Sequence, residues 1–214
     1  MRYGAVAMDG GHRTYRRQFL ASAFKAGALL ALGWTVSPRR ALSYGEKMKQ
    51  PDTAAFTDDG TIPNNRFPLL LYRGVINAES TDPAAQIEVH FAANNWTNSW
   101  RNGIYPFHHY HSNTHEVLGV FNGTALLHLG GEAGGKIAVQ EGDIIVIPAG
   151  VGHKCIRHSE DFTVVGAYPD GLEPDLNKGE KGDRPKADEN IAAVPLPATD
   201  PLLGTDGGLL LIWI

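Results

Sequence analysis

Three histidines and one glutamate in this 214-residue chain stand at spacings that suit a divalent metal ion. His109 and His111 are two residues apart, so in an extended strand both side chains project from the same face. Glu116 follows after a short polar link, and His153 follows the turn-rich residues 148–152. If the four side chains converge on one ion, two coordination positions stay open, as in metal sites that perform chemistry.

Arg157 is a candidate for anchoring a substrate. It alternates with His153 along the chain, so we expect it to point toward the metal, where its guanidinium would hold a carboxylate or another anion. The alternative is that the strand twists and Arg157 turns outward or pairs with an acid. Cys155 shares the alternation, and we expect it to be a small buried hydrophobic residue rather than a ligand.

Tyr105 and His115 are candidates for moving a proton during a reaction. His115 and His108 also adjoin the metal-binding positions, so either could hydrogen-bond to a metal ligand and orient it. Partial exposure is the simpler expectation for both histidines, because they fall outside the metal spacing. A group of aromatic residues just before the ligands is expected either to close a barrel or to line a pocket: Trp96, Trp100, Tyr105, Phe107 and Tyr110.

The segments that would position these side chains are β-strands. From residue 57 onward we find no long segment with apolar residues at helical spacing, but short apolar runs bounded by Gly, Pro, Asn and Asp. Such punctuation is typical of an antiparallel sandwich or barrel. Within one run Ile87, Val89 and Phe91 are expected to share a strand face. The expected strands cover residues 69–72, 86–91, 117–121, 125–129, 136–139, 144–147 and 162–168.

Three segments outside these strands have distinct compositions. The glycine-rich residues 130–135 are expected to form a hairpin loop, because they lack the Lys-Ser/Thr ending and the following helix of a phosphate loop. Residues 170–190 are polar and are expected to form a surface excursion. Residues 209–214 are apolar but too short to cross a membrane, so we expect them to dock on the body or on a second subunit.

The first 43 residues have the layout of an export signal. They hold seven basic residues and one acid, a net charge of +6, whereas the other 171 residues hold 12 basic and 22 acidic ones, a net charge of −10. Arg16 and Arg17 are followed by Gln-Phe-Leu, an apolar stretch and small residues near position 42. This order resembles a twin-arginine export signal, although Tyr15 stands where that signal usually has Ser or Thr.

We therefore expect cleavage of residues 1–43 and export of residues 44–214 to the periplasm or the medium, with no stable membrane span after cleavage. The alternative is an uncleaved membrane anchor beginning at Phe19, although this stretch is barely long enough and carries Lys25. The acidic body argues against a nucleic-acid partner, since phosphate neutralisation needs clustered Lys and Arg. A single cysteine rules out an intramolecular disulfide.

Two stretches of the chain resemble the sequence motifs of the cupins. The first motif is matched at Gly103, His109, His111, Glu116 and Gly123. The second motif is matched at Gly142, Pro148, Gly150 and His153. Arg157 departs from the pattern, because the second motif usually ends in Asn there. Over roughly residues 57–214 the chain is also similar to the uncharacterised YjlB-like branch of the family.

The resemblance implies an all-β fold, a small double-stranded β-helix or jelly-roll barrel that follows the signal segment. The barrel would hold its metal inside the wider mouth. Its core would cover about residues 66–169, followed by a polar C-terminal extension over residues 170–214. Cupins of this kind are often dimers, and the apolar C-terminus also favours a homodimer.

The resemblance supplies no reaction, and three functions stay open. The first is an oxidoreductase, a dioxygenase or oxidase, in which an organic substrate and dioxygen occupy the open positions on Fe or Mn. The second is a non-redox isomerase, epimerase or decarboxylase that uses the ion as a Lewis acid. The third is a non-enzymatic protein that binds a small ligand or sequesters metal.

The expected export narrowly favours the first of these functions, the oxidoreductase. A twin-arginine substrate crosses the membrane folded, so it can acquire Mn or Fe before it meets Cu or Zn, which bind such sites more tightly. We expect one divalent transition metal, with Mn or Fe favoured and Zn, Ni, Cu and Co as alternatives. The expected partner is a small molecule, and Arg157 favours an anionic one.

Overall fold

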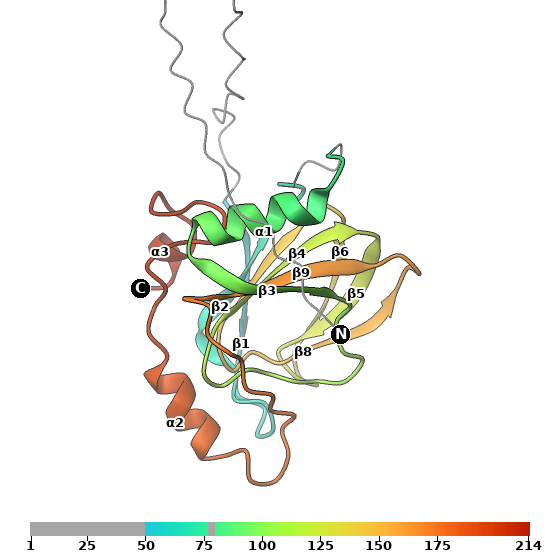
Figure 1. Cartoon of the computed structure of the whole chain (residues 1–214). Helices are drawn as coiled ribbons and strands as arrows, with labels where there is room; N and C mark the ends of the chain where they lie inside the picture. Colours follow the sequence, from blue (N-terminus) through green and yellow to red (C-terminus); the bar gives the residue numbers. More distant parts are fainter. Residues whose placement is uncertain (1–49, 77–79) are drawn as a thin grey trace, which may run out of the picture. The chain divides into compact units, whose positions relative to one another are not determined.

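The computed structural model describes residues 50–76 and 80–214. The expected export signal, its cleavage site and the alternative anchor from Phe19 lie outside the described residues. Among the residues described, no helix combines the length and the apolar character needed to cross a membrane. Two antiparallel sheets dominate the fold, as the sequence predicts (Figure 1).

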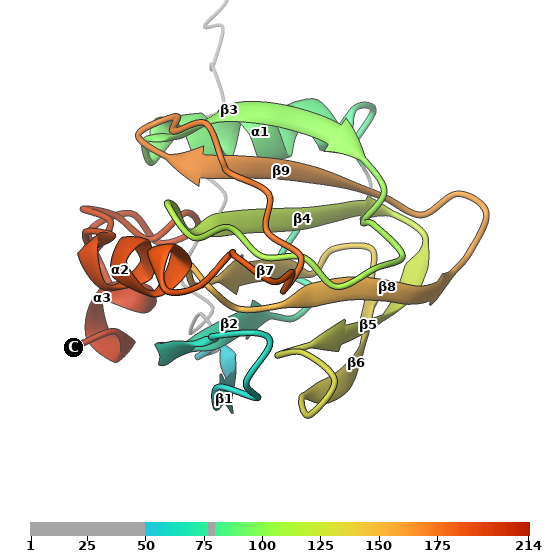
Figure 2. The same ribbon diagram turned by 90° about the horizontal axis from the view of Figure 1, so that it is seen from below.

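The larger sheet has six strands in the order β1-β2-β7-β4-β9-β3. These strands are β1 (Asp52–Phe56), β2 (Asn65–Tyr72), β3 (Trp96–Asn102), β4 (Glu116–Asn122), β7 (Ile144–Ile147) and β9 (Thr163–Pro169). The smaller sheet has the order β6-β5-β8 and consists of β5 (Thr124–Leu129), β6 (Gly135–Gln140) and β8 (His153–His158). Figure 2 shows the six strands following one another, with β8, β5 and β6 to one side. The prediction of an all-β jelly-roll barrel is confirmed.

The six-stranded sheet is buried on both faces. One face meets the smaller sheet through a core cluster that includes Leu69, Leu71, Leu118, Leu127, Ile145 and Val164. The opposite face is covered by a second cluster that includes Leu70, Phe91, Val117, Val146 and Trp213. Because neighbouring residues of one strand enter different clusters, β7 and the second half of β2 are continuous apolar runs rather than alternating ones.

The expected strand over residues 86–91 is wrong, because α1 (Pro83–Ala93) occupies this position and lies against β3, β4 and β9 (Figure 1). Asp82 caps the helix, since its carboxylate accepts a hydrogen bond from a backbone N–H of the first turn. Ile87 and Phe91 are fully buried four residues apart, whereas Val89 between them is 71 % exposed. The apolar residues therefore follow the helical period, and the alternation with Val89 was coincidental.

Strands β1 and β3 have no counterpart among the predicted strands. They form the two edges of the larger sheet, and their side chains are mostly exposed or half-buried. Such edges carry weak hydrophobic alternation, which is the signal that sequence analysis needs. Strand β8 was predicted only through the alternation of His153, Cys155 and Arg157.

The C-terminal segment packs on the body of the same chain. It contains the helices α2 (Lys186–Ala193) and α3 (Leu209–Ile212). Trp213 is almost completely buried, stacks on Phe67 with ring centroids 5.5 Å apart, and donates Nε1–H to the carbonyl of Pro68 at 2.8 Å. The prediction that residues 209–214 dock on the body is confirmed, and the homodimer stays a prediction.

Because residues 83–93 form a helix, Phe91 and Val89 should contribute unequally to the free energy of unfolding. We expect Phe91→Ala to lower the free energy of unfolding by about 3–5 kcal/mol, because the ring is buried in the core. Val89→Ala is the matched control and should change it by less than about 0.5 kcal/mol. Urea unfolding followed by circular dichroism measures both, and equal losses would contradict the helix.

Candidate metal centre

A short ladder of backbone hydrogen bonds brings His109 and His153 face to face. Residues 105–109 run along the free edge of β8, where the N–H of His153 donates to the carbonyl of His109 at 2.9 Å and the reverse bond is 3.2 Å long. The centroids of the two imidazole rings are 4.0 Å apart. Cys155 N–H continues the ladder by donating to the carbonyl of Tyr105 at 2.9 Å. The backbone register, and not a flexible loop, thus sets the distance between these two rings.

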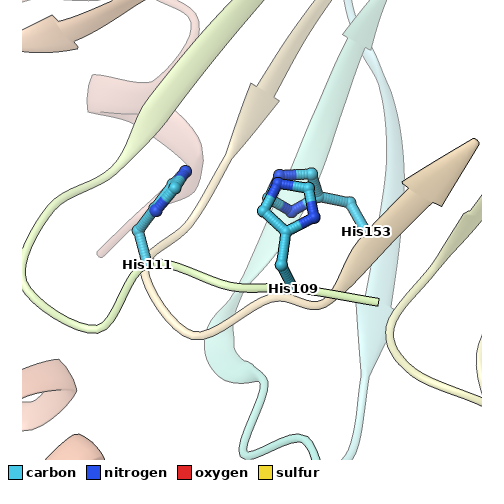
Figure 3. A group of neighbouring side chains, drawn as sticks. All are labelled: His109, His111 and His153. Atoms are coloured by element: carbon cyan, nitrogen blue, oxygen red, sulfur yellow. The ribbon is translucent and has the colours of Figure 1, made fainter. Parts of the chain in front are cut away.

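His111 joins the pair from the same extended segment. Its carbonyl accepts a hydrogen bond of 2.8 Å from the N–H of Gly150, which adopts a φ of +85°. A Cβ atom at Gly150 would lie 2.5 Å from the carbonyl oxygen of Asn64, so this position requires glycine. Figure 3 shows the rings of His109, His111 and His153 gathered together, and one nitrogen of each lies within 4.8 Å of the others.

Glu116 completes the set from the first position of β4. Its carboxylate is buried, and Oε2 lies 3.3 Å from Nε2 of His153 and 3.6 Å from Nε2 of His111. Ligand atoms that share one metal ion at about 2.0–2.2 Å are roughly 3–4 Å apart. The three histidines therefore have the spacing needed to hold a divalent cation, and Glu116 adjoins them through His111 and His153.

Backbone carbonyls fix the orientation of all three imidazole rings. Nδ1 of His109 faces the carbonyl of Phe107 at 3.4 Å, and Nδ1 of His153 faces the carbonyl of Val151 at 3.1 Å. Nδ1 of His111 is hydrogen-bonded to the carbonyl of Asp175. Because each Nδ1–H donates to an oxygen, each Nε2 keeps a lone pair directed toward the other ligands.

Only one oxygen of Glu116 is satisfied by the protein. Oε1 accepts a hydrogen bond of 3.1 Å from the hydroxyl of Tyr168, which itself accepts one of 2.8 Å from Nε1–H of Trp100. Oε2 has no hydrogen-bond partner among the described residues, although it is buried. A buried, unpaired carboxylate oxygen that faces the imidazole nitrogens is the arrangement that a bound cation would satisfy.

Burial and mutual contact set the charges of these groups. Burial alone would raise the pKa of Glu116, but His111 and His153 outweigh it and hold this pKa below its usual range. Burial, reinforced by the neighbouring His153, lowers the pKa of His109 to about 2, so that this ring is neutral. Burial acts to lower the pKa of His111 as well, but the Glu116 carboxylate raises it overall. A cation would compete with a proton for Nε2 of His111, because a metal ligand must be the neutral imidazole.

The four side chains lie in the wall of a cavity of about 610 Å³. Its other walls combine aromatic, apolar and polar side chains, and they include Trp100, Arg101, Ile104, Tyr105, Leu118, Tyr168 and Glu173. Pockets of this size and mixed character take up small organic molecules.

The chain was compared with known proteins. A family model described as the cupin domain matches residues 102–165. The uncharacterized protein YjlB of Bacillus subtilis (strain 168) is 44 % identical over 167 residues, which cover 78 % of this chain and 98 % of YjlB. The chain belongs to the cupins, in the branch of YjlB. This confirms the family that the sequence motifs predict.

Solved structures resemble this cupin more distantly. Acireductone dioxygenase from Bacillus anthracis, determined with a cadmium ion in its active centre, is 13 % identical with a TM-score of 0.37, over 50 % of this chain and 82 % of that chain. Oxalate decarboxylase from Bacillus subtilis, a protein with Mn(II) centres, is 17 % identical with a TM-score of 0.32, over 61 % of this chain and 30 % of that chain.

Arg157, which was expected to anchor a substrate, does not face the cavity. A bulge between Leu126 and Leu127 shifts the pairing with β8, so that Arg157 is exposed and does not line the cavity, whereas Cys155 stays buried. The bulge breaks the alternation on which the expectation depended. Tyr105 does line the cavity, half-exposed, with its ring edge-on to His109 at 5.0 Å between centroids.

His115 is buried on the other side of β4 and does not line the cavity. Its Nδ1 accepts a hydrogen bond of 3.0 Å from Ala149 N–H, and its ring packs on Trp213 with centroids 4.9 Å apart. The expectation of partial exposure is therefore wrong for His115, while His108 is half-buried as expected. Of the other aromatic residues before the ligands, Trp96 and Tyr110 belong to the core.

Sequence analysis missed Tyr168 and Asp175. Tyr168 supports Glu116 from β9, and Asp175 reaches the site from the polar residues 170–190 that were expected to be a surface excursion. The carboxylate of Asp175 accepts hydrogen bonds from the backbone N–H and the hydroxyl of Ser112. Tyr168 could have been found from the alternation of side chains along the expected strand over residues 162–168, which it ends. Nothing in the sequence places Asp175 beside His111.

Tyr168→Phe is expected to weaken metal binding, because it removes the donor that holds Glu116. Loss of such an outer hydrogen bond typically lowers metal affinity about 10–100-fold. Titration of the chelator-stripped protein with Mn²⁺ gives the dissociation constant. Tyr105→Phe, in the same cavity but not bonded to Glu116, is the control and should bind as tightly as the wild type.

His115 should make stability depend on pH. Burial lowers its pKa from 6.5 to about 4 in the folded state, so the unfolded chain binds more protons between these values, and stability falls as pH decreases. From pH 7 to pH 4 this one group should contribute a loss of about 3 kcal/mol. Urea unfolding with chelator present should therefore show a flatter pH profile for His115→Gln. The exposed His158, replaced by Gln, is the control and should leave the profile unchanged.

Proposed function

We propose that this cupin is a metal-dependent enzyme that oxidises a small organic molecule with dioxygen. The observation that carries the proposal is the unpaired Oε2 of Glu116, which faces imidazole nitrogens at the wall of an open cavity. Buried polar atoms almost always have a bonding partner, and a cation would be the partner that Oε2 lacks.

The ion would be held by His109, His111, Glu116 and His153. When bound, an Fe or Mn ion would supply the redox chemistry that couples an organic substrate to dioxygen. Mn and Fe are favoured by the proposed twin-arginine export, which would let the chain fold around its metal before it meets Cu or Zn.

The chain's own residues would orient the substrate and exclude water. Trp100 and Tyr105 offer aromatic surface, while Ile104 and Leu118 provide apolar walls. The guanidinium of Arg101 is the cationic group among the described lining residues, and two hydrogen bonds of 2.7 Å hold it on Glu88. Because Glu88 already pairs with this cation, an uncharged organic molecule fits better than the anionic one that Arg157 favoured.

Tyr168 would keep its proton throughout the reaction. Burial raises the pKa of its hydroxyl, and the neighbouring Glu116 carboxylate raises it further. The hydroxyl therefore holds Oε1 of Glu116 and leaves Oε2 for the ion. This is a positioning role, because Tyr168 acts through the ligand.

An isomerase or decarboxylase is the second candidate. Such a reaction needs a group that moves a proton, and Glu173 is the described lining carboxylate that is neither a proposed ligand nor bonded to Ser112. Glu173 accepts a hydrogen bond of 3.1 Å from Asn98, so it has a fixed position at the cavity. We prefer oxidation by dioxygen because that reaction depends less on a protein group that moves a proton.

The test is elemental analysis of the full-length protein purified from its own compartment. We expect about one Fe or Mn per chain, and a loss of about 90 % or more in His109→Ala and in Glu116→Gln. His158→Ala, an exposed histidine at the end of β8, is the control and should keep the metal. Substrate-dependent oxygen consumption should vanish in the same two variants.

Three outcomes would contradict parts of the proposal. Zn or Ni that is lost in His109→Ala and in Glu116→Gln, without oxygen consumption, would favour the second candidate, and Glu173→Gln would then test the base. Absence of metal in the wild type would leave a ligand-binding barrel. Equal metal content in the wild type and in His109→Ala would place the metal elsewhere.

A further inference from the structure

A second cluster of metal-binding side chains lies on the opposite face of the smaller sheet. Along β8, His153 faces the candidate metal centre, so Lys154 faces outward. On β5, Leu129 pairs with His153 and His128 pairs with Lys154, which places His128 on the outer face. His108 precedes His109 in the segment that extends this sheet, so it also faces outward.

His108, His128 and Glu132 come together on this outer face. Their ligand atoms all lie within 4.8 Å of one another, and the two imidazole centroids are 4.9 Å apart. Nε2 of His108 lies 3.4 Å from one oxygen of Glu132, and Nδ1 of His128 lies 4.0 Å from the other. These separations match the roughly 3–4 Å expected between ligands of one ion.

The two ring nitrogens of the half-buried His108 point to a missing partner. Its side chain is only 10 % exposed, yet neither ring nitrogen has a hydrogen-bond partner within residues 50–76 and 80–214. A buried imidazole normally bonds through at least one nitrogen, because an unsatisfied polar group inside a protein is costly. A cation between His108 and His128 would satisfy both rings.

The cluster is also accessible from solvent. His108 and Glu132 line a cavity of about 720 Å³ together with Phe107 and Lys178. The Glu132 side chain is 75 % exposed, so its carboxylate can adjust to an ion while the two buried rings stay fixed. Lys154 competes for the site, because its ammonium group contacts Oε1 of Glu132.

We propose that His108, His128 and Glu132 form a second metal site, which binds a divalent cation of the zinc class with water completing the coordination. Two imidazoles and one carboxylate suit Zn²⁺ and its neighbours better than Mg²⁺ or Ca²⁺. The site is independent of the proposed oxidation. An ion there would brace the ladder that holds His109 against His153, since His108 precedes His109 and His128 lies on β5, which pairs with β8.

Titration of the chelator-stripped full-length protein with Zn²⁺ tests the site, with calorimetry for affinity and elemental analysis for stoichiometry. Zn²⁺ binds imidazole and carboxylate sites generally, so we expect both clusters to fill and the wild type to bind two ions. His128→Asn and His153→Asn should each bind one ion, and the double variant none. His158→Asn is the control and should bind two.

Two further variants keep the proposal falsifiable. If His128→Asn does not fold, as judged by circular dichroism, His108→Gln replaces it with the same expected loss of one ion. Lys154→Met should tighten the second site about fivefold, the equivalent of one exposed ion pair, because it frees Glu132. A wild type whose single ion is lost in His153→Asn but kept in His128→Asn, or a His128→Asn variant that still binds two, would overturn the proposal, whatever metal and reaction the first site has.

Discussion

The structure depends on a buried negative charge. The Glu116 carboxylate is removed from water at the first position of β4, and a charge in such a place must be compensated. The surrounding elements each supply part of that compensation. The β8 ladder brings His153, the extended segment after residue 105 brings His111, and β9 brings the hydroxyl of Tyr168. The barrel can be understood as the scaffold that assembles these three partners around the carboxylate, two of them from distant parts of the sequence.

Sequence analysis reached the barrel and the ligand set but not their surroundings. The buried strands were found because their apolar runs are continuous, and the ligands because their spacing matches cupin motifs. Helix α1 was misread because Ile87 and Phe91 fit both periods, and only the exposure of Val89 separates them. Arg157 was misplaced because a β-bulge leaves no mark in the residue pattern. Asp175 was missed because a contact across 64 positions has no local signal.

The two faces of the smaller sheet show how one backbone register can serve two clusters. Adjacent residues on three neighbouring segments, such as His153 and Lys154 on β8, point to opposite sides of the sheet. A slip of one residue in this register would exchange the inner and outer side chains and destroy both clusters together. The β-bulge beyond Cys155 lies just past this region, where the alternation is no longer needed.

The burial of Trp213 ties the C-terminal helices to the metal centre. Its ring packs on His115, the neighbour of Glu116, and stacks on Phe67 in the core. Residues 209–214 therefore cover the residue that directly precedes a proposed ligand. Detaching this segment would open His115 to water and loosen the start of β4, so a segment outside the barrel helps to hold Glu116 in place.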